Sequence, residues 1–139
     1  MLTRVLCRFS EPMYALLRIF SGLLFFCHGA QKLFGWMGGT VRSDPLMVVA
    51  GIVELLGGVA IAAGILTSVA AFLSAGQMAI AYLIAHAPQG LWPIENGGEK
   101  ALMYLLIFLL IASRGPGIWS IQTIFFKNCK VVEPPEKKE

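Results

Sequence analysis

Charged and amide side chains interrupt the long apolar runs of this sequence, and these are the residues that could do chemistry. They are Arg18, His28, Lys32, Glu54, Gln77 and Glu99. An ionisable group inside a membrane span costs at least about 2.5–3.5 kcal/mol, so such groups are retained where they pair, bind a ligand or handle a proton. Carboxylate, imidazole and ammonium groups held close together can donate and accept protons at a bound molecule.

The spacing of these residues places them on inward faces of helices. At about 100° per residue, Arg18 and Lys32 share one stripe of the first apolar run, with His28 beside it. In the second run, Glu54 shares a stripe with glycines and alanines, which let a neighbouring helix come close. Gln77 shares a small-residue face of the third run. We therefore expect all three faces to turn toward one another.

Depth along the helices predicts where these groups meet. At about 1.5 Å per residue, Glu54 lies roughly 13 Å and His28 about 9 Å below the outer ends of their helices. The prediction is a ligand-binding pocket in the outer half of the protein, with Arg18 as an alternative charge partner of Glu54 from below. Its lining residues are His28, Lys32, Glu54, Gln77 and Glu99.

Each residue also has a purely structural interpretation. The long side chains of Lys32 and Arg18 can snorkel to the two membrane surfaces. Glu54 is too short and too deep to do so, and is either paired with a cation or protonated. Gln77 can act as a hydrogen bond between helices. His86 falls on the opposite face of its helix from Gln77, which predicts an interfacial position.

The composition excludes a water-soluble domain. Of 139 residues, 57% are hydrophobic and 14% charged, with a mean hydropathy of +0.73. Soluble domains have about 45–50% apolar and about 25% charged residues. The net charge of +3 comes from basic residues near the ends of an apolar chain, a pattern that indicates membrane orientation rather than binding of nucleic acid.

The apolar runs predict four membrane spans. They are expected at about residues 10–34, 45–66, 69–87 and 96–114, followed by a short interfacial segment at 118–126. The predicted division is a membrane domain, 1–126, and a disordered polar tail, 127–139. Thr67-Ser68 would join the second and third spans directly, and Asn96 with Glu99 would form a capping box at the fourth.

Basic residues predict the orientation of these spans. Most of them lie on the side of the chain ends, and cytoplasmic loops carry an excess of Lys and Arg. The predicted fold is an all-α integral membrane protein, an antiparallel four-helix bundle with both termini in the cytoplasm. Cys7, Cys27 and Cys129 lie far apart without a C-x-x-C pair, so neither a dithiol mechanism nor a metal site is expected.

Several short motifs, taken in order, resemble a known family. They are Arg18-x9-His28-Gly29-x2-Lys32, Gly51-x2-Glu54-x2-Gly57-Gly58, Gln77-Met78-x2-Ala81, Asn96-Gly97-Gly98-Glu99 and Gly115-Pro116-Gly117. Over roughly residues 15–122 this ordered set resembles the DoxX family of small bacterial membrane proteins. One departure follows the last motif, where the family usually has an aspartate and this chain has Gln122.

The resemblance implies a redox association in the bacterial inner membrane. The family is similar to the membrane subunits of thiosulfate:quinone oxidoreductase, which implies a quinone or similar small molecule, with Glu54, His28 and Lys32 as proton donors. The sequence has no haem-ligand pair, iron–sulfur cysteines or dinucleotide loop, so electrons would come from a partner protein. Whether the chain is itself part of an oxidoreductase stays open.

Two other classes of function remain open from the sequence. One is a small proton- or anion-coupled transporter built around Glu54 and Lys32, which would need a homo-oligomer because four spans are few. The other is a structural or assembly factor for a membrane redox complex, with no chemistry of its own.

Overall fold

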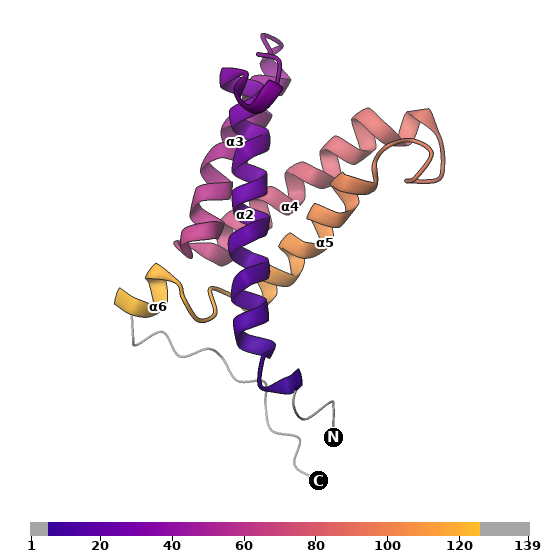
Figure 1. The fold of residues 1–139 in the computed structure, drawn as a ribbon. Coiled ribbons are helices and arrows are strands. Elements are labelled where there is room, and N and C mark those ends of the chain that lie inside the picture. Colours follow the sequence, from indigo (N-terminus) through magenta and orange to yellow (C-terminus); the bar gives the residue numbers. More distant parts are fainter. Residues whose placement is uncertain (1–5, 126–139) are drawn as a thin grey trace.

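The structure is a computed structural model that describes residues 6–125, and all its long elements are α-helices (Figure 1). The α-helices are α2 (Ser10–Phe34), α3 (Pro45–Ala63), α4 (Thr67–Ala81), α5 (Glu99–Arg114) and α6 (Ile121–Phe125). Short turns of helix are η1 (Trp36–Gly38), the π-helical η2 (Tyr82–His86) and η3 (Ala87–Gln89). The described residues contain no strand, which confirms the all-α prediction for this part of the chain.

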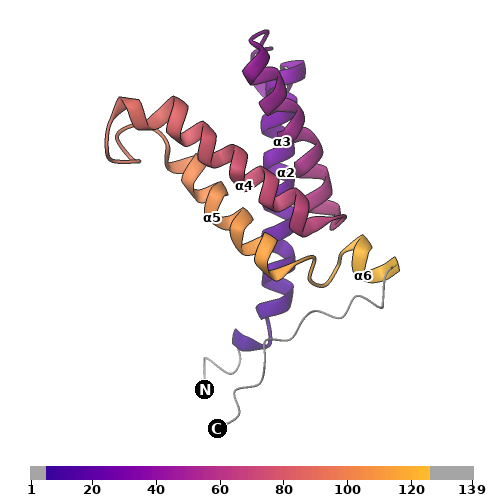
Figure 2. The same ribbon diagram turned by 180° about the vertical axis from the view of Figure 1, so that it is seen from behind.

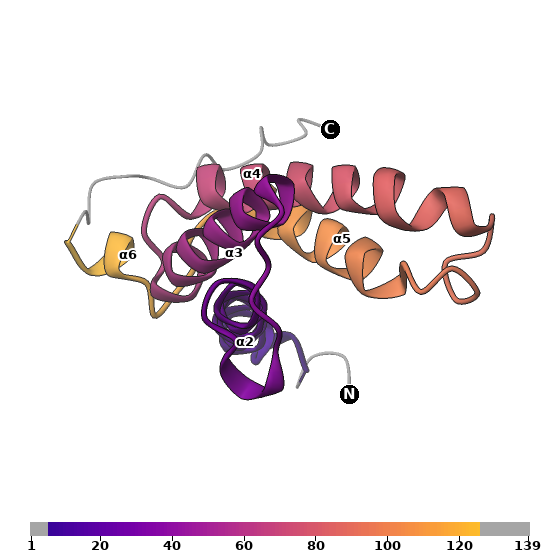
Figure 3. The ribbon, with the colours of Figure 1, turned by 90° about the horizontal axis from the view of Figure 1, so that it is seen from above.

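The helices form two antiparallel pairs. Figures 1 and 2 show α2 beside α3, and α4 beside α5, with the second pair leaning away from the first. Viewed from above, in Figure 3, the α4–α5 pair points away from α2 along most of its length. The two pairs meet near the turn between α3 and α4, and Tyr14 of α2 donates a hydrogen bond of 2.5 Å to the Gly115 carbonyl at the end of α5.

Glycines bring α2 and α3 into backbone contact. A Cβ atom built on Gly22 would lie 2.6 Å from the Ala62 nitrogen, and one built on Gly58 would lie 2.5 Å from the Phe26 nitrogen. Real Cβ atoms do not approach so closely, so glycine is required at both positions. Small residues at such spacing let membrane helices pack through their backbones. This close approach fixes the register of α2 against α3.

The ends of α3 follow local signals in the sequence. The Asp44 side chain accepts a hydrogen bond of 3.2 Å from the Met47 nitrogen, and Pro45 occupies the first turn, where its missing N–H costs nothing. At the other end Gly64 has φ +72°, the left-handed conformation that closes many helices. The helix therefore ends at Ala63, earlier than the predicted Leu66, and α4 begins at Thr67 rather than at residue 69. Residues 64–66 join the two helices, so the predicted link at Thr67-Ser68 is wrong.

The start of α5 differs from the predicted capping box. The Asn96 Oδ1 accepts from the Gly98 nitrogen at 2.8 Å, and its Nδ2 donates to the Gly90 carbonyl at 2.9 Å. The Asn96 nitrogen bonds to the Trp92 carbonyl instead of the Glu99 side chain. Asn96 therefore ties the loop together, and the predicted reciprocal cap with Glu99 is wrong.

Three helical segments in the described residues are long and apolar enough to cross a membrane. They are Ser10–Phe34, Pro45–Ala63 and Thr67–Gln89. Helix α5 has 16 residues, about 24 Å at 1.5 Å per residue, against a hydrocarbon core of about 30 Å. A closed four-helix bundle with cytoplasmic termini stays a prediction, as does the division at residue 126, and the predicted tail lies outside the described residues.

Candidate functional site

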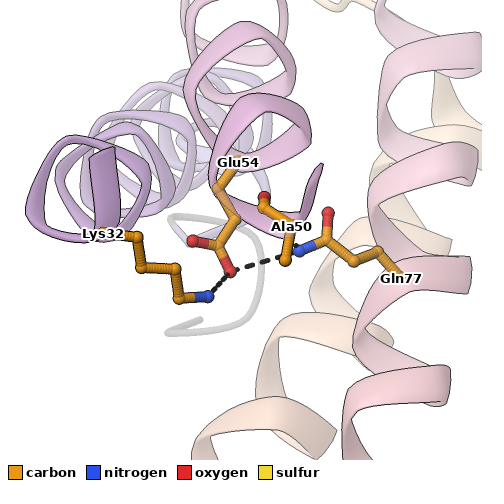
Figure 4. A network of polar contacts seen from close by, with 4 residues as sticks. All are labelled: Lys32, Ala50, Glu54 and Gln77. Carbon is orange, nitrogen blue, oxygen red and sulfur yellow. Dashed lines mark hydrogen bonds and ion pairs between the residues drawn. The ribbon is translucent and has the colours of Figure 1, made fainter. Parts of the chain in front are cut away.

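An ion pair between α2 and α3 forms the centre of the site (Figure 4). The Lys32 Nζ contacts the Glu54 Oε1, across 22 positions of sequence. The Glu54 side chain is 2% exposed and the Lys32 side chain 28%. A carboxylate this deeply buried needs compensation, and an ammonium in direct contact supplies it. Of the predicted partners of Glu54, the structure selects Lys32.

Gln77 brings α4 to the same carboxylate. Its Nε2 lies 3.2 Å from the Glu54 Oε1 and 3.2 Å from the Ala50 carbonyl oxygen (Figure 4). The amide therefore donates to both the side chain and the backbone of α3. Three helices meet at Glu54 as a result, and Gln77 forms the interhelical hydrogen bond that its position indicated.

The carboxylate retains unused hydrogen-bonding capacity. Glu54 Oε1 accepts from Lys32 and Gln77, while Glu54 Oε2 is buried and has no partner among the described residues. The Gln77 Oε1 is likewise buried without a partner there. Buried polar atoms are nearly always hydrogen-bonded, so each such exception calls for an explanation.

A polar chamber of about 210 Å³ adjoins the ion pair. We use this name for the space lined by Phe25, His28, Lys32, Glu54, Met78, Ala81, His86, Lys100, Ala101 and Tyr104. Its walls come from α2, α3, α4, η2 and α5. The chamber therefore lies between the two helical pairs, and it is lined by both charged and apolar side chains.

A second, larger space opens beside the chamber. This lateral cavity, of about 590 Å³, is lined by Leu17, Phe20, Ser21, Leu24, His28, Glu99, Lys100, Met103, Tyr104 and Ile107. His28, Lys100 and Tyr104 line both spaces, so they stand at the boundary between them. Phe20, Leu24 and Met103 are more than half exposed, at 60%, 57% and 53%, which puts the mouth of this cavity on an apolar outer surface.

The predicted pocket residues are thus brought together only in part. His28, Lys32 and Glu54 line the polar chamber, and Gln77 contacts Glu54 from behind it. Glu99 lines the lateral cavity and not the chamber. Lys100 and Tyr104 also line the chamber, and the sequence analysis did not single them out. The one signal that could have found them is their position on the helix that begins at Glu99.

His86 was predicted to lie on the helix face opposite Gln77, and the structure corrects this face assignment. It lines the polar chamber, and its Nδ1 lies 3.0 Å from the Asn96 carbonyl oxygen. The reason is η2, a turn of π-helix. Each residue of a π-helix rotates the chain about the helix axis by a smaller angle than a residue of an α-helix does. An ideal α-helix projected from Gln77 therefore assigns His86 to the wrong face.

Arg18 neither snorkels nor pairs with Glu54 in the structure. The side chain is fully buried, and Nη1 donates to the Ile61 and Ala62 carbonyls, both at 2.7 Å. Its Nη2 donates to the Trp119 carbonyl at 2.8 Å. A cation at the carboxyl end of a helix is favoured by the helix dipole. Arg18 therefore caps α3 and ties it to the segment after α5, away from the polar chamber.

Two further sequence expectations concern metals and thiols. In the part of the chain from residue 6 to 125, no group of three or more His, Cys, Asp or Glu could hold a metal ion. Cys7 is exposed and Cys27 half-buried, both as free thiols, and Cys129 lies outside the described residues.

The apolar helices and the buried ion pair define a small helical membrane protein with an internal polar chamber. Comparison with known sequences gives its family: the DoxX family model matches residues 13–87. A relative from Haemophilus influenzae (strain ATCC 51907 / DSM 11121 / KW20 / Rd), described as an uncharacterized protein, is 37% identical over 122 residues, covering 82% of this chain and 91% of its own. No solved structure matches. The chain belongs to the DoxX family.

Proposed function

We propose that this protein is a redox-associated membrane subunit that binds a quinone, or a similar small molecule with an apolar tail. The observation that carries the proposal is the junction of two unlike spaces at His28, Lys100 and Tyr104. The lateral cavity offers apolar walls to a tail, and the polar chamber offers hydrogen-bonding groups to a head. An amphiphilic ligand taken from the lipid phase matches this combination.

The volumes support this pairing. The polar chamber, at about 210 Å³, exceeds the roughly 150 Å³ of an apolar protein cavity that accommodates benzene, so its volume is large enough for a six-membered ring. The lateral cavity, at about 590 Å³, falls within the roughly 300–1,000 Å³ of small-molecule sites. Ligand sites of this kind combine mostly apolar walls with a few polar groups that fix orientation.

The side chains around the chamber can hold and move protons. A bound quinone supplies reversible uptake of electrons and protons at its two ring oxygens. Lys32, His28 and Tyr104 each carry an N–H or O–H group that can donate to a ring oxygen. Glu54 contacts the Lys32 ammonium and balances its positive charge on the α2–α3 side of the chamber. General acid–base transfer requires groups within hydrogen-bonding reach of the reacting oxygen. Lys32, His28 and Tyr104 all line the same chamber, so a ring bound there would lie near all three.

The proposal includes a place in the cell. The protein is a multi-pass protein of the bacterial inner membrane with both termini in the cytoplasm, and its chamber lies in the outer half of the bilayer. Helix α5, with the residues that precede it, forms the fourth span. A redox partner protein exchanges electrons with the bound head, or a second copy of the chain completes the assembly.

The test measures quinone retained by the purified protein. Full-length protein is purified in lipid nanodiscs, and its extracted lipids are analysed by mass spectrometry. Leu24→Trp places a large side chain at the mouth of the lateral cavity, whereas Leu23→Trp makes the same change at an exposed neighbour that does not line it. We expect quinone in the wild type and in Leu23→Trp, and less of it in Leu24→Trp.

Other outcomes favour the alternative functions. Wild-type protein without any enriched quinone contradicts the proposal. If such protein nevertheless moves protons or anions across vesicles, the transporter interpretation replaces it. If the protein only stabilises a redox complex that purifies with it, the assembly-factor interpretation replaces the proposal.

A further inference from the structure

We propose that the same site also binds an amphiphile whose head is a negatively charged oxygen group, and that Lys100 contacts this head. The inference rests on the proposed function, because it uses the polar chamber and the lateral cavity, and it names a second class of ligand for them. It is carried by the balance of charges around the chamber and by the absence of an acidic partner for Lys100 among residues 6–125.

Positive groups outnumber negative groups around the polar chamber. Its lining includes two lysines, two histidines and a single carboxylate. The Oε1 of that carboxylate, Glu54, contacts the Lys32 ammonium, and its Oε2 is buried. The charge of the second lysine, Lys100, therefore stays uncompensated by the chamber wall. A histidine that takes up a proton adds to the positive charge. The chamber thus favours a ligand head that brings negative charge with it.

Lys100 is placed to meet such a head. It lies in the first turn of α5, is exposed, and lines both the polar chamber and the lateral cavity. It takes part in none of the ion pairs among the described residues. Its neighbour Glu99 lines the lateral cavity but not the chamber, so it faces Lys100 only from the lateral side. The chamber side of Lys100 is left for an anion.

The start of α5 adds to the attraction for negative charge. Gly98, which precedes the helix, provides no side-chain cap, and the first-turn residues Lys100 and Ala101 line the chamber. The first N–H groups of a helix have no partner within it, and the helix dipole makes this end positive. Tyr104, one turn later, lines the chamber as well and carries an O–H that can donate to an oxygen.

The lateral cavity favours an amphiphile over a small hydrophilic anion. Its walls include Leu17, Phe20, Leu24 and Ile107, and its volume is about 590 Å³. A hydrophilic anion gains nothing from such walls, whereas an alkyl chain is removed from water against them. With the chain in this cavity, the head of the molecule lies at the boundary with the chamber, where Lys100 is. The ligand class is therefore an alkyl chain that ends in a carboxylate or a phosphate.

The experiment measures binding of charged and uncharged chains to the full-length protein in phosphatidylcholine nanodiscs, whose lipids carry no net charge. The probes are isotope-labelled oleate, oleoyl lysophosphatidate and oleyl alcohol, and empty nanodiscs give the share of each probe that the bilayer holds. Hydrogen bonds to charged groups are stronger than neutral ones, but solvent screens an exposed lysine. We therefore expect oleate or the lysophosphatidate to bind at least about threefold tighter than the alcohol. The tighter of the two identifies carboxylate or phosphate as the preferred head.

Variants of Lys100 test the contact itself. Lys100→Gln should lose the preference for the anionic probes, and Lys100→Arg, which keeps the charge, should retain most of it. Arg42→Gln is the matched control, because it removes a cation at an exposed position that lines neither space. Equal affinity of the wild type for all three probes overturns the inference without any variant. An unchanged preference in folded Lys100→Gln also overturns it.

Failure of this inference differs from failure of the proposed function, because the quinone content of the purified protein is measured separately. Retained quinone without any preference for the anionic probes overturns the inference alone. Tighter binding of an anionic probe, lost in Lys100→Gln, by protein that retains no quinone supports the inference and contradicts the assignment of a quinone. If the protein holds neither quinone nor any probe, both proposals fail.

Discussion

Gly29 of α2 and Gly51 of α3 lie in backbone contact: a Cβ atom built on Gly29 would be 2.6 Å from the Gly51 carbonyl oxygen. Because the helices are antiparallel, Lys32 lies beside Gly51, whose built Cβ would be 3.3 Å from the Lys32 Cβ, and Glu54 lies one turn away in the direction of Gly29. The contact between the glycines therefore sets the distance and the register at which the ammonium meets the carboxylate. The sequence indicates the site by its charged residues, and in the structure the position of those residues depends on the contact between two glycines.

The first prediction concerns this glycine contact. In Gly29→Ala the new methyl group meets the Leu55 nitrogen at 2.5 Å, and backbone atoms cannot move aside cheaply. Overpacking of this kind typically costs 1–3 kcal/mol, so we expect a loss of about 3 kcal/mol in the free energy of unfolding. Gly76→Ala in α4 is the matched control, because nothing lies within 4 Å of its built Cβ. Reversible unfolding in mixed micelles gives both values, and equal stability of the two variants would contradict the packing account.

The second prediction concerns the charge balance at Glu54. Lys32→Met leaves a buried carboxylate without its cation, and breaking a buried pair costs roughly 3–5 kcal/mol. Since the Lys32 side chain is 28% exposed, we expect a loss near the lower end of that range. The double variant Lys32→Met/Glu54→Gln removes both charges and should be more stable than Lys32→Met. A double variant that unfolds more easily than the single one would show that the pair is not what compensates Glu54.

The third prediction separates Arg18 from the polar chamber. Arg18→Lys cannot reproduce a guanidinium that donates from two nitrogens to carbonyls of both α3 and the segment near Trp119. We expect a lower melting temperature with unchanged ligand content per folded protein. Arg42→Lys, at an exposed position, is the control and should behave as the wild type. Loss of ligand from folded Arg18→Lys would place Arg18 within the site after all.

Much of the fold could be predicted because its signals are local. Asp44-Pro45 and Gly64 mark the ends of α3 through their own backbone preferences, and the apolar runs give the helices. Depth and helix face indicated that Glu54 meets a cation, with Lys32 as one of several possible partners, and the structure shows Lys32 in contact with it. These features depend on spacing along one or two helices.

The remaining features depend on contacts that spacing does not reveal. The π-helical turn at Tyr82–His86 departs from the rotation of about 100° per residue on which the face assignments relied, and His86 lines the chamber as a result. Arg18 finds its partners among backbone carbonyls, including that of Trp119, about 100 residues away. Asn96 bonds to its own loop rather than to the first turn of α5. Every residue has a backbone carbonyl, so the sequence does not show which carbonyl a side chain will bond to. A prediction that pairs charged side chains only with one another therefore misplaces a residue such as Arg18.

The fourth prediction concerns orientation in the membrane. The bias of Lys and Arg predicts that the chain ends lie in the cytoplasm and that η1, which contains Gly38, faces outward. Reporter fusions at Lys130 and at Gly38 should therefore report opposite sides, with Lys130 cytoplasmic. A periplasmic signal at Lys130 would reverse the orientation and move the polar chamber to the inner half of the bilayer.

The quinone content of Glu54→Gln tests the central claim most directly. This substitution keeps the shape and hydrogen bonding of Glu54 while removing the charge that meets Lys32. The wild type, Glu54→Gln and the control Gly76→Ala are purified in nanodiscs, and bound quinone per folded protein is measured by mass spectrometry. We predict quinone in the wild type and control, and its loss from a folded Glu54→Gln protein. Equal quinone content in all three, or none in any, would contradict the account and leave the ion pair with a structural role alone.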